Sequence, residues 1–325
     1  MQSWPDIFPK FKNLNILIIG DVMVDAYIWG AVERISPEAP VPIISVKNRD
    51  FRLGGAANVA LNIFSLGAKP ILCALAGQDS YGKRLLQLME DKGMSQQGIV
   101  ISTSRPTTIK ARVIAAHQHV IRIDDESDAV ATAEEEQELI SRIKTLLPTC
   151  QAVIFEDYDK GVITQKLIEE TVKLAKSLGI PTIVDPKKRN FLHYKNVTLF
   201  KPNLKELRDG LKLEIEGGDQ ASVNTAVEKV KKQLGVEGVM LTLSERGAYI
   251  DYQNKKVHVA AHKREIADVS GAGDTVVSIA ALCVALDLGP EKIAMLSNLG
   301  GGLVCQYVGV VPINREELLK ETSIL

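Results

Sequence analysis

Runs of apolar, largely β-branched residues alternate with amphipathic stretches along most of this 325-residue chain. The runs hold almost no polar residue, which is typical of strands buried on both faces of a sheet. The stretches between them repeat apolar residues at helical spacing. We therefore predict a mainly parallel sheet with helices on both faces. The predicted strands are Asn15–Gly20, Pro70–Leu75, Ala152–Phe155, Thr182–Val184, Thr198–Phe200 and Gly238–Leu241, and the predicted helices are Ala56–Leu66, Tyr81–Lys92, Ala133–Leu146, Gln165–Leu178, Ala221–Leu234, Ala272–Leu286 and Pro290–Tyr307.

Two segments depart from this alternation. In Ala26–Val46 and Thr107–Asp124, β-branched and aromatic residues alternate with polar ones, which favours antiparallel strands over crossover units. The chain has no internal repeat and no Pro/Gly/Ser-rich linker. We expect one α/β domain over residues 1–325, with a small β-sheet lid formed by about residues 22–50 and 100–125.

Composition and charge narrow the range of partners. The chain carries 39 Lys and Arg against 40 Asp and Glu, so no overall field attracts nucleic acid or anionic lipid. It has no signal-peptide pattern and no uncharged run long enough for a membrane span. Its four cysteines are far apart and predict reduced thiols in a cytoplasmic protein. The closest histidine pair, His117 and His119, lacks a third ligand nearby, so we expect no structural metal.

The clearest chemical signal is the segment Asp268-Val-Ser-Gly271-Ala272-Gly273-Asp274, which directly precedes an apolar helical run. Small residues at a helix start leave backbone N–H groups open to a ligand, and the helix dipole adds positive charge there. This pattern predicts an anion site. A carboxylate beside a bound phosphate fits a base that accepts the proton of an attacking hydroxyl, although Asp274 is equally a favourable helix-start residue.

A second glycine-rich element, Gly54-Gly55-Ala-Ala-Asn58, also opens a predicted helix. The Asn58 amide can both donate to and accept from hydroxyl groups. Asp21 and Asp25 follow the first predicted strand, at the sheet edge where open α/β folds bind ligands. These residues are candidates to bind sugar hydroxyls. The alternative is that Gly54-Gly55 is only a turn and that Asp21 and Asp25 are only loop carboxylates. Neither GxGxxG nor GxxxxGK[ST] occurs, which disfavours dehydrogenases and P-loop enzymes.

Together, the Gly54-Gly55…Asn58…Gly67…Gly77 and Gly271-Ala-Gly-Asp274 segments resemble in order and spacing the two signatures of the ribokinase-like, or phosphofructokinase B, carbohydrate kinases. The resemblance extends from Asn15 to the last helix. It implies a three-layer α/β/α fold with a lid, and ATP and Mg²⁺ as cofactors. Asn203-x-x-Glu206 resembles the element near the metal-bound phosphates, which implies an indirect Mg²⁺ role. The nucleotide-side positions implied by the resemblance are Ser244, Gly247 and Asn298.

Within that family, four segments look most like D-glycero-β-D-manno-heptose 7-phosphate kinases: residues 20–27, 34–42, 156–161 and 185–187. The resemblance implies ATP-dependent phosphorylation of the anomeric hydroxyl to the 1,7-bisphosphate, for ADP-heptose and lipopolysaccharide core synthesis. No HxGH-like motif of a fused nucleotidyltransferase is present, so we expect the kinase part alone. The alternatives are a kinase of the same fold for another sugar or sugar phosphate, and an inactive sugar-phosphate sensor.

The resemblance also implies roles for individual residues. Asp274 would be the base and the amides of Gly271, Ala272 and Gly273 the anion hole. The sugar hydroxyls would contact Asn58, Asp25, Gly54 and Gly55, with Asp21 nearby. By charge, the candidates for the sugar phosphate are Lys110, Arg112, Lys160 and Lys187, and Lys187 is the first choice because it follows the predicted strand Thr182–Val184 at its carboxyl end.

The apolar lid residues need a cover. In related kinases lids often pair between subunits, so we expect a homodimer through the lid. The apolar contact would come from Tyr27, Ile28, Trp29, Val41, Ile43, Val113 and Ile121.

Overall fold

The computed structural model describes residues 2–115 and 118–325, and within them nine strands form the main sheet. The spatial order is β13-β12-β11-β10-β9-β8-β1-β4-β5. Neighbours from β11 to β5 are parallel, whereas β12 and β13 are antiparallel additions at one edge. The strands are β1 (Asn15–Gly20), β4 (Lys69–Gly77), β5 (Ile99–Ser102), β8 (Ala152–Glu156), β9 (Thr182–Asp185), β10 (Leu199–Phe200), β11 (Gly238–Thr242), β12 (Ala248–Tyr252) and β13 (Lys255–Val259).

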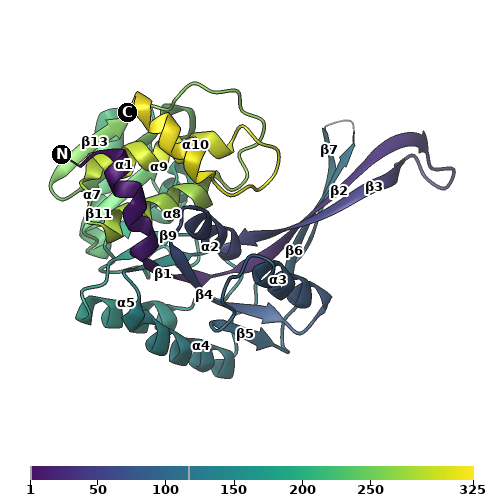
Figure 1. Ribbon diagram of the computed structural model, residues 1–325, viewed down its shortest axis with the longest axis horizontal. Helices are drawn as coiled ribbons and strands as arrows, with labels where there is room; N and C mark the ends of the chain where they lie inside the picture. Colours follow the sequence, from purple (N-terminus) through teal and green to yellow (C-terminus); the bar gives the residue numbers. More distant parts are fainter. Residues whose placement is uncertain (1, 116–117) are drawn as a thin grey trace.

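Helices cover both faces of this sheet, as the sequence predicts (Figure 1). Helices α4 to α7 pack on one face, and α1, α2, α3, α8, α9 and α10 contribute to the core on the other. Their bounds are α1 (Trp4–Ile7), α2 (Ala56–Ser65), α3 (Ser80–Glu90), α4 (Ala133–Leu146), α5 (Gln165–Ser177), α6 (Leu204–Leu211), α7 (Gln220–Leu234), α8 (Ala272–Ala285), α9 (Pro290–Val304) and α10 (Arg315–Glu321), with 3₁₀ turns η1 (Phe8–Asn13), η2 (Leu147–Thr149), η3 (Ser244–Arg246) and η4 (Thr322–Ile324).

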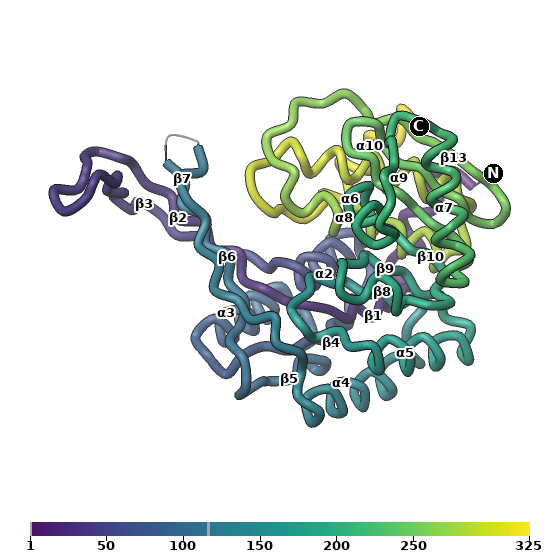
Figure 2. Tube along the Cα trace, turned by 180° about the vertical axis from the view of Figure 1, so that it is seen from behind, coloured from purple at the N-terminus to yellow at the C-terminus, as the bar shows by residue number. Residues whose placement is uncertain are grey.

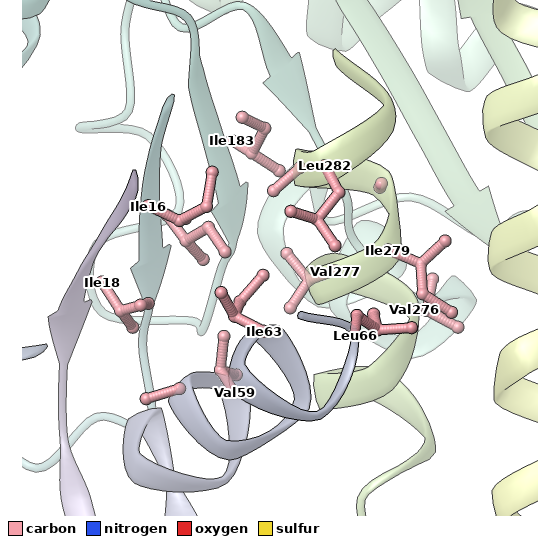
Figure 3. Packing of buried hydrophobic residues seen from close by; sticks show 14 of the residues in the cluster. Ile16, Ile18, Val59, Ile63, Leu66, Ile183, Val276, Val277, Ile279 and Leu282 are labelled. Atoms are coloured by element: carbon pink, nitrogen blue, oxygen red, sulfur yellow. The ribbon is translucent and has the colours of Figure 1, made fainter. Parts of the chain in front are cut away.

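The core between α2, α8 and the sheet fixes the position of two helix N-termini. Val59 and Ile63 of α2 face Val277 of α8, and strand residues such as Ile16 lie beside them (Figure 3). All four side chains are fully buried. Large apolar side chains buried in this way contribute about 1.5–3 kcal/mol each, so the two helices are held rigidly against the sheet and against each other.

A separate four-stranded sheet, the lid, projects from one side of the main domain (Figures 1 and 2). Its order is β3-β2-β6-β7, with β2 (Val22–Ile35), β3 (Pro42–Gly55), β6 (Thr108–Ala115) and β7 (Gln118–Asp125). The β2–β3 and β6–β7 pairs are antiparallel as expected, but β2 and β6 run parallel. The expected lid bounds need correction: β3 continues to Gly55, and residues 99–102 pair with β4 of the main sheet. The predicted His117–His119 pair lies partly outside the described residues, because His117 is not among them.

The two faces of the lid differ in chemistry. Cross-strand neighbours point to the same face, so Asp25 shares a face with Lys110, and Tyr27 shares that face with Arg112. The opposite face carries apolar residues, of which Ile121 and Ile123 are 54% and 55% exposed. The lid therefore presents one charged face and one apolar face.

Two predictions from composition can be compared with the structure. All four cysteines are buried and free, as expected for reduced thiols. No helix in residues 2–115 and 118–325 is long and apolar enough to cross a bilayer.

Candidate active site

The candidate site lies where β1, β8 and β9 end and where α2 and α8 begin. Both helices start at a glycine with positive φ: Gly55 at +58° before α2 and Gly271 at +81° before α8. Other residues rarely adopt this backbone conformation, so the glycines let the chain turn sharply into each helix. The turns place Asn58 and Asp274 in the first turns of their helices, facing each other.

Asp274 is the centre of the arrangement. Its side chain is buried, and its two carboxylate oxygens accept hydrogen bonds from different elements. The Asn58 amide donates to Oδ2 at 2.7 Å, and the Tyr158 hydroxyl donates to Oδ1 at 2.8 Å. Burial raises the pKa of Asp274, and these two donors only partly oppose that rise. A buried carboxylate with a raised pKa is suited to accepting a proton.

Beside Gly273 lies a buried group of charges. A Cβ at Gly273 would stand 3.5 Å from an Asp185 oxygen and 3.9 Å from the Lys201 ammonium. Lys201 binds Asp185 at 2.8 Å and is only 2% exposed. Burial and the neighbouring Asp185 raise the pKa of Glu156, which lies on the adjacent strand. At the start of α8 the Ala272 amide donates to the Val269 carbonyl at 3.3 Å, which corrects its expected place in the anion hole. The Gly273 position lies beside a lysine that is held in place by a carboxylate.

The Asn203–Glu206 pair forms the capping box of α6. The Asn203 side chain accepts from the Glu206 amide, and Glu206 accepts from the Asn203 amide, both at 2.8 Å. The other Glu206 oxygen accepts from the Lys187 ammonium. Burial acts to lower the pKa of Lys187, but the nearby carboxylates outweigh burial and raise that pKa, so this lysine stays charged. The pair therefore both caps a helix and anchors Lys187.

The donor atoms near this pair fit the chemistry of Mg²⁺. Both Glu156 oxygens and one Asp185 oxygen are buried without a hydrogen-bond partner, and carboxylate oxygens are ligands that a hard cation prefers. In the described part of the chain, no group of three or more Asp, Glu, His or Cys is close enough to form a complete metal cage. Such a site suits Mg²⁺, which usually keeps several waters and binds through one or two carboxylates and substrate phosphates.

Asp21 and Asp25 have different surroundings, although both are buried. Asp21 accepts hydrogen bonds from the backbone amides of Tyr158, Lys160 and Val162, so its carboxylate holds the loop after β8. Asp25 pairs with the Arg112 guanidinium on the neighbouring lid strand. Gly54 lies directly against Asp25, where any side chain would collide with the carboxylate.

The four cations predicted as phosphate ligands all have carboxylate partners. Lys110 and Lys160 come from the lid and from the loop after β8, and Glu126 lies between them, 3.5 Å from Lys110 and 2.6 Å from Lys160. Arg112 pairs with Asp25, and its guanidinium lies 5.4 Å from the centroid of the Tyr27 ring. The structure brings two of the four together, Lys110 and Lys160, and places Lys187 with Glu206 instead.

The predicted nucleotide-side residues lie on the antiparallel side of the sheet. Ser244 and Gly247 belong to the turn between β11 and β12, with φ values of +54° and +89°. Asn298 of α9 donates to the Ala260 carbonyl at 2.9 Å, which ties the helix to the chain after β13. A role for these three residues in nucleotide binding stays a prediction.

Sequence reasoning gave no role to Tyr158, Lys201, Glu156 and Glu126. Tyr158 and Glu156 lie in the quoted heptose-kinase segment, but the Tyr158 hydroxyl bonds to Asp274, 116 positions later, and the charge that acts most on Glu156 is that of Asp185 on the adjacent strand. Lys201 follows the short strand β10 and pairs with a residue of β9. The available signal was position: polar residues that follow buried strands gather at one edge of the sheet.

A family model described as "pfkB family carbohydrate kinase" matches residues 13–316. The bifunctional protein HldE of Wolinella succinogenes is 38% identical over 304 residues, which are 94% of this chain and 64% of that protein. The HldE of Desulfatibacillum aliphaticivorans is also 38% identical, over 95% of this chain and 63% of its own length. The chain thus spans less than two thirds of the length of either relative.

Solved structures agree on the fold. Phosphofructokinase-2 from Escherichia coli in complex with potassium has a TM-score of 0.80 at 19% identity, over 96% of this chain and 99% of that one. Ribokinase from Arabidopsis thaliana, complexed with ribose and ATP, has a TM-score of 0.73 at 19% identity, over 94% and 99%. The expected ribokinase-like fold is confirmed. With its family match over nearly the whole length, the chain belongs to the pfkB family of carbohydrate kinases.

Proposed function

We propose that this chain transfers the terminal phosphoryl group of ATP to the anomeric hydroxyl of D-glycero-β-D-manno-heptose 7-phosphate. The HldE relatives and the sequence segments typical of heptose kinases support this substrate. The observation that carries the reaction is the buried Asp274 carboxylate, fixed by two donors beside the glycine turn at the start of α8. A sensor that only binds its ligand has no need of a buried base at this position.

Each part of the site has a role in this proposal. Asp274 accepts the proton of the attacking hydroxyl, and the Gly271 and Gly273 amides with Lys201 hold the transferring phosphoryl group. Asn203 and Glu206 would support a bound Mg²⁺ indirectly, and the ion would supply positive charge beside the ATP phosphates. The sequence resemblance assigns the nucleotide to the side of Ser244, Gly247 and Asn298.

The sugar lies between the lid and α2 in this proposal. Asn58, Asp25, Gly54 and Gly55 contact its hydroxyls, and Asp21 acts by holding the loop after β8. For the sugar phosphate we favour Lys110 and Lys160, because Glu126 already shows that one anion binds both. Arg112 supports Asp25, and Lys187 belongs with Glu206 on the side of the transferring phosphate.

The test is a panel of sugars and sugar phosphates with ATP and Mg²⁺, read by phosphorus NMR of the products. The proposal predicts turnover of heptose 7-phosphate with a new anomeric phosphate signal. A preference for another sugar phosphate would show that the chain is a kinase of this family with a different substrate. If the chain binds sugar phosphates but turns over none of them, the alternative of an inactive sugar-phosphate sensor is supported instead.

We also propose that two copies of this chain pair through the apolar face of the lid. Ile121 and Ile123 of β7, Val46 of β3 and Val41, which directly precedes β3, are between 45% and 55% exposed, and such an exposed apolar group is unusual in an isolated domain. Three residues of the expected contact set are corrected: Tyr27 is fully buried, Val113 is 8% exposed, and Trp29 shares the charged face of the lid with Tyr27. Tyr27 is covered because its hydroxyl accepts from the Val310 amide and its ring packs near Arg52 and Arg112.

Replacing Ile121 by Lys should separate the pair, since a charge in an apolar contact loses its hydration. Light scattering at micromolar concentration should give twice 35.5 kDa for the unchanged protein and 35.5 kDa for Ile121→Lys. Val130→Lys, an exposed apolar position outside the lid strands, is the matched control. A mass of 35.5 kDa for the unchanged protein would contradict the dimer.

A further inference from the structure

Tyr158 makes a contact with the candidate base that the family signatures do not include. Its hydroxyl donates to Oδ1 of Asp274 at 2.8 Å, while Asn58 donates to Oδ2 at 2.7 Å. Two donors from different elements therefore hold one carboxylate. A carboxylate held at both oxygens cannot rotate freely. On each oxygen one lone pair is engaged by the donor, so only the remaining lone pair can accept a proton.

The Tyr158 side chain is itself held firmly. Its backbone amide donates to Asp21 at 2.8 Å, and the Lys187 ammonium lies 5.4 Å from the centroid of its ring. Burial and the Asp274 charge raise the pKa of the phenol well above its ordinary value. The hydroxyl therefore stays protonated at neutral pH and acts as a donor, not as a second base.

We propose that Tyr158 is a positioning residue of the phosphoryl transfer, whose hydroxyl orients Asp274 and stabilises its ionised form. The inference rests on the proposed function, because it takes Asp274 as the base. It adds a role for a residue that acts through its hydrogen bond to Asp274. Through its ring, Tyr158 also connects the base with Lys187, which pairs with Glu206 on the phosphate side.

The groups around Asp274 determine in which direction its pKa changes when the Tyr158 hydroxyl is removed. Burial raises its pKa most, the charges of Asp25 on β2 and Asp185 at the end of β9 raise it further, and the buried Glu156 on β8 interacts with it unfavourably. The hydrogen bonds from Asn58 and Tyr158 lower it. The base works when ionised, so kcat/KM rises with pH through its pKa. Losing the Tyr158 donor raises that pKa and moves the acid limb of the profile to higher pH.

The experiment compares the pH profiles of kcat/KM for the unchanged protein, Tyr158→Phe and Tyr194→Phe. Tyr194 is the matched control: it is buried, and its hydroxyl donates at 2.7 Å to Asp157, which is not the base. We expect Tyr158→Phe to move the acid limb up by about one pH unit, the size of one lost hydrogen bond to a charged group. Tyr194→Phe should leave the limb in place. KM for ATP should change less than about twofold in both.

A second variant keeps the hydroxyl but should shift the acid limb of the pH profile in the opposite direction. Difluorotyrosine at position 158 is a more acidic, stronger donor, so the acid limb should move to lower pH. An unmoved limb in both position-158 variants, or equal shifts in Tyr158→Phe and Tyr194→Phe, would overturn the positioning role. Either result would leave the base itself intact, because that assignment is tested separately by Asp274→Asn.

Discussion

The region around Asp274 and the charged face of the lid hold their polar groups in different ways. In the core, the Asp274 carboxylate is buried and is held by two neutral donors, Asn58 and Tyr158. Beside the lid, Lys110 of β6 and Lys160 of the loop after β8 face a carboxylate, Glu126, whose side chain is 30% exposed. Neutral donors fix a base without cancelling its charge, whereas an exposed carboxylate can give way to another anion at little cost. In the proposed function, the core therefore holds the base and the side of the lid binds an anion that can be exchanged.

Replacing Asp274 by Asn would break the core side of this comparison and has the largest expected effect. The amide keeps the size of the side chain but accepts no proton, so kcat should fall by about two to four powers of ten. Steady-state kinetics with the sugar phosphate measures the loss, and Asp209→Asn, an exposed acid of α6, is the control. If Asp274→Asn keeps more than about a third of the original kcat, Asp274 is not the base.

The second prediction compares the packing of the two regions. Ile63 of α2 is fully buried between α8 and the sheet, whereas Ile123 of β7 is 55% exposed. Ile63→Ala should lower the free energy of unfolding by about 2–5 kcal/mol, because it removes buried methyl groups and leaves a cavity. Ile123→Ala should change it by less than about 0.5 kcal/mol. Urea denaturation at a concentration where the chain is monomeric measures both, and equal losses would show that the lid is packed as tightly as the core.

Replacing Lys110 of the lid has the smallest expected effect. Lys110→Met keeps the aliphatic stem but removes one charge from the proposed phosphate subsite, so KM for the sugar phosphate should rise about tenfold. KM for ATP and kcat should stay within about twofold. Lys83→Met, on α3, is the control. A rise in the ATP KM alone would place Lys110 on the nucleotide side.

The sequence was sufficient for six of the nine strands that the structure describes in the main sheet, because these central strands are nearly continuous apolar runs. Two glycine turns located the starts of α2 and α8, since positive φ there requires glycine. The β12–β13 hairpin was not predicted, because β13 is short and mostly exposed and so carries little apolar pattern. Helix α6 was missed as well, although Asn203 and Glu206 form a capping box, a sequence signal for a helix start.

The partners of the charged side chains could not be predicted. Arg112 looks like a free cation in the sequence, yet it pairs with Asp25, 87 positions earlier on a parallel neighbouring strand. Lys160 and Lys110 meet through Glu126 only because the chain after β7 returns to the loop after β8. Long-range pairing of this kind depends on the register of strands, and no local pattern of residues encodes it.

The account proposes that Asp274 in the core serves catalysis and that Lys110 of the lid serves binding of the sugar phosphate. Calorimetric titration of heptose 7-phosphate into a variant of each residue tests this proposal most directly. The account predicts that Asp274→Asn binds the sugar phosphate with a Kd within about threefold of the unchanged protein, although its turnover is lost. It predicts that Lys110→Met binds about tenfold more weakly, although its kcat is kept. Loss of binding in Asp274→Asn together with unchanged binding in Lys110→Met would contradict the account.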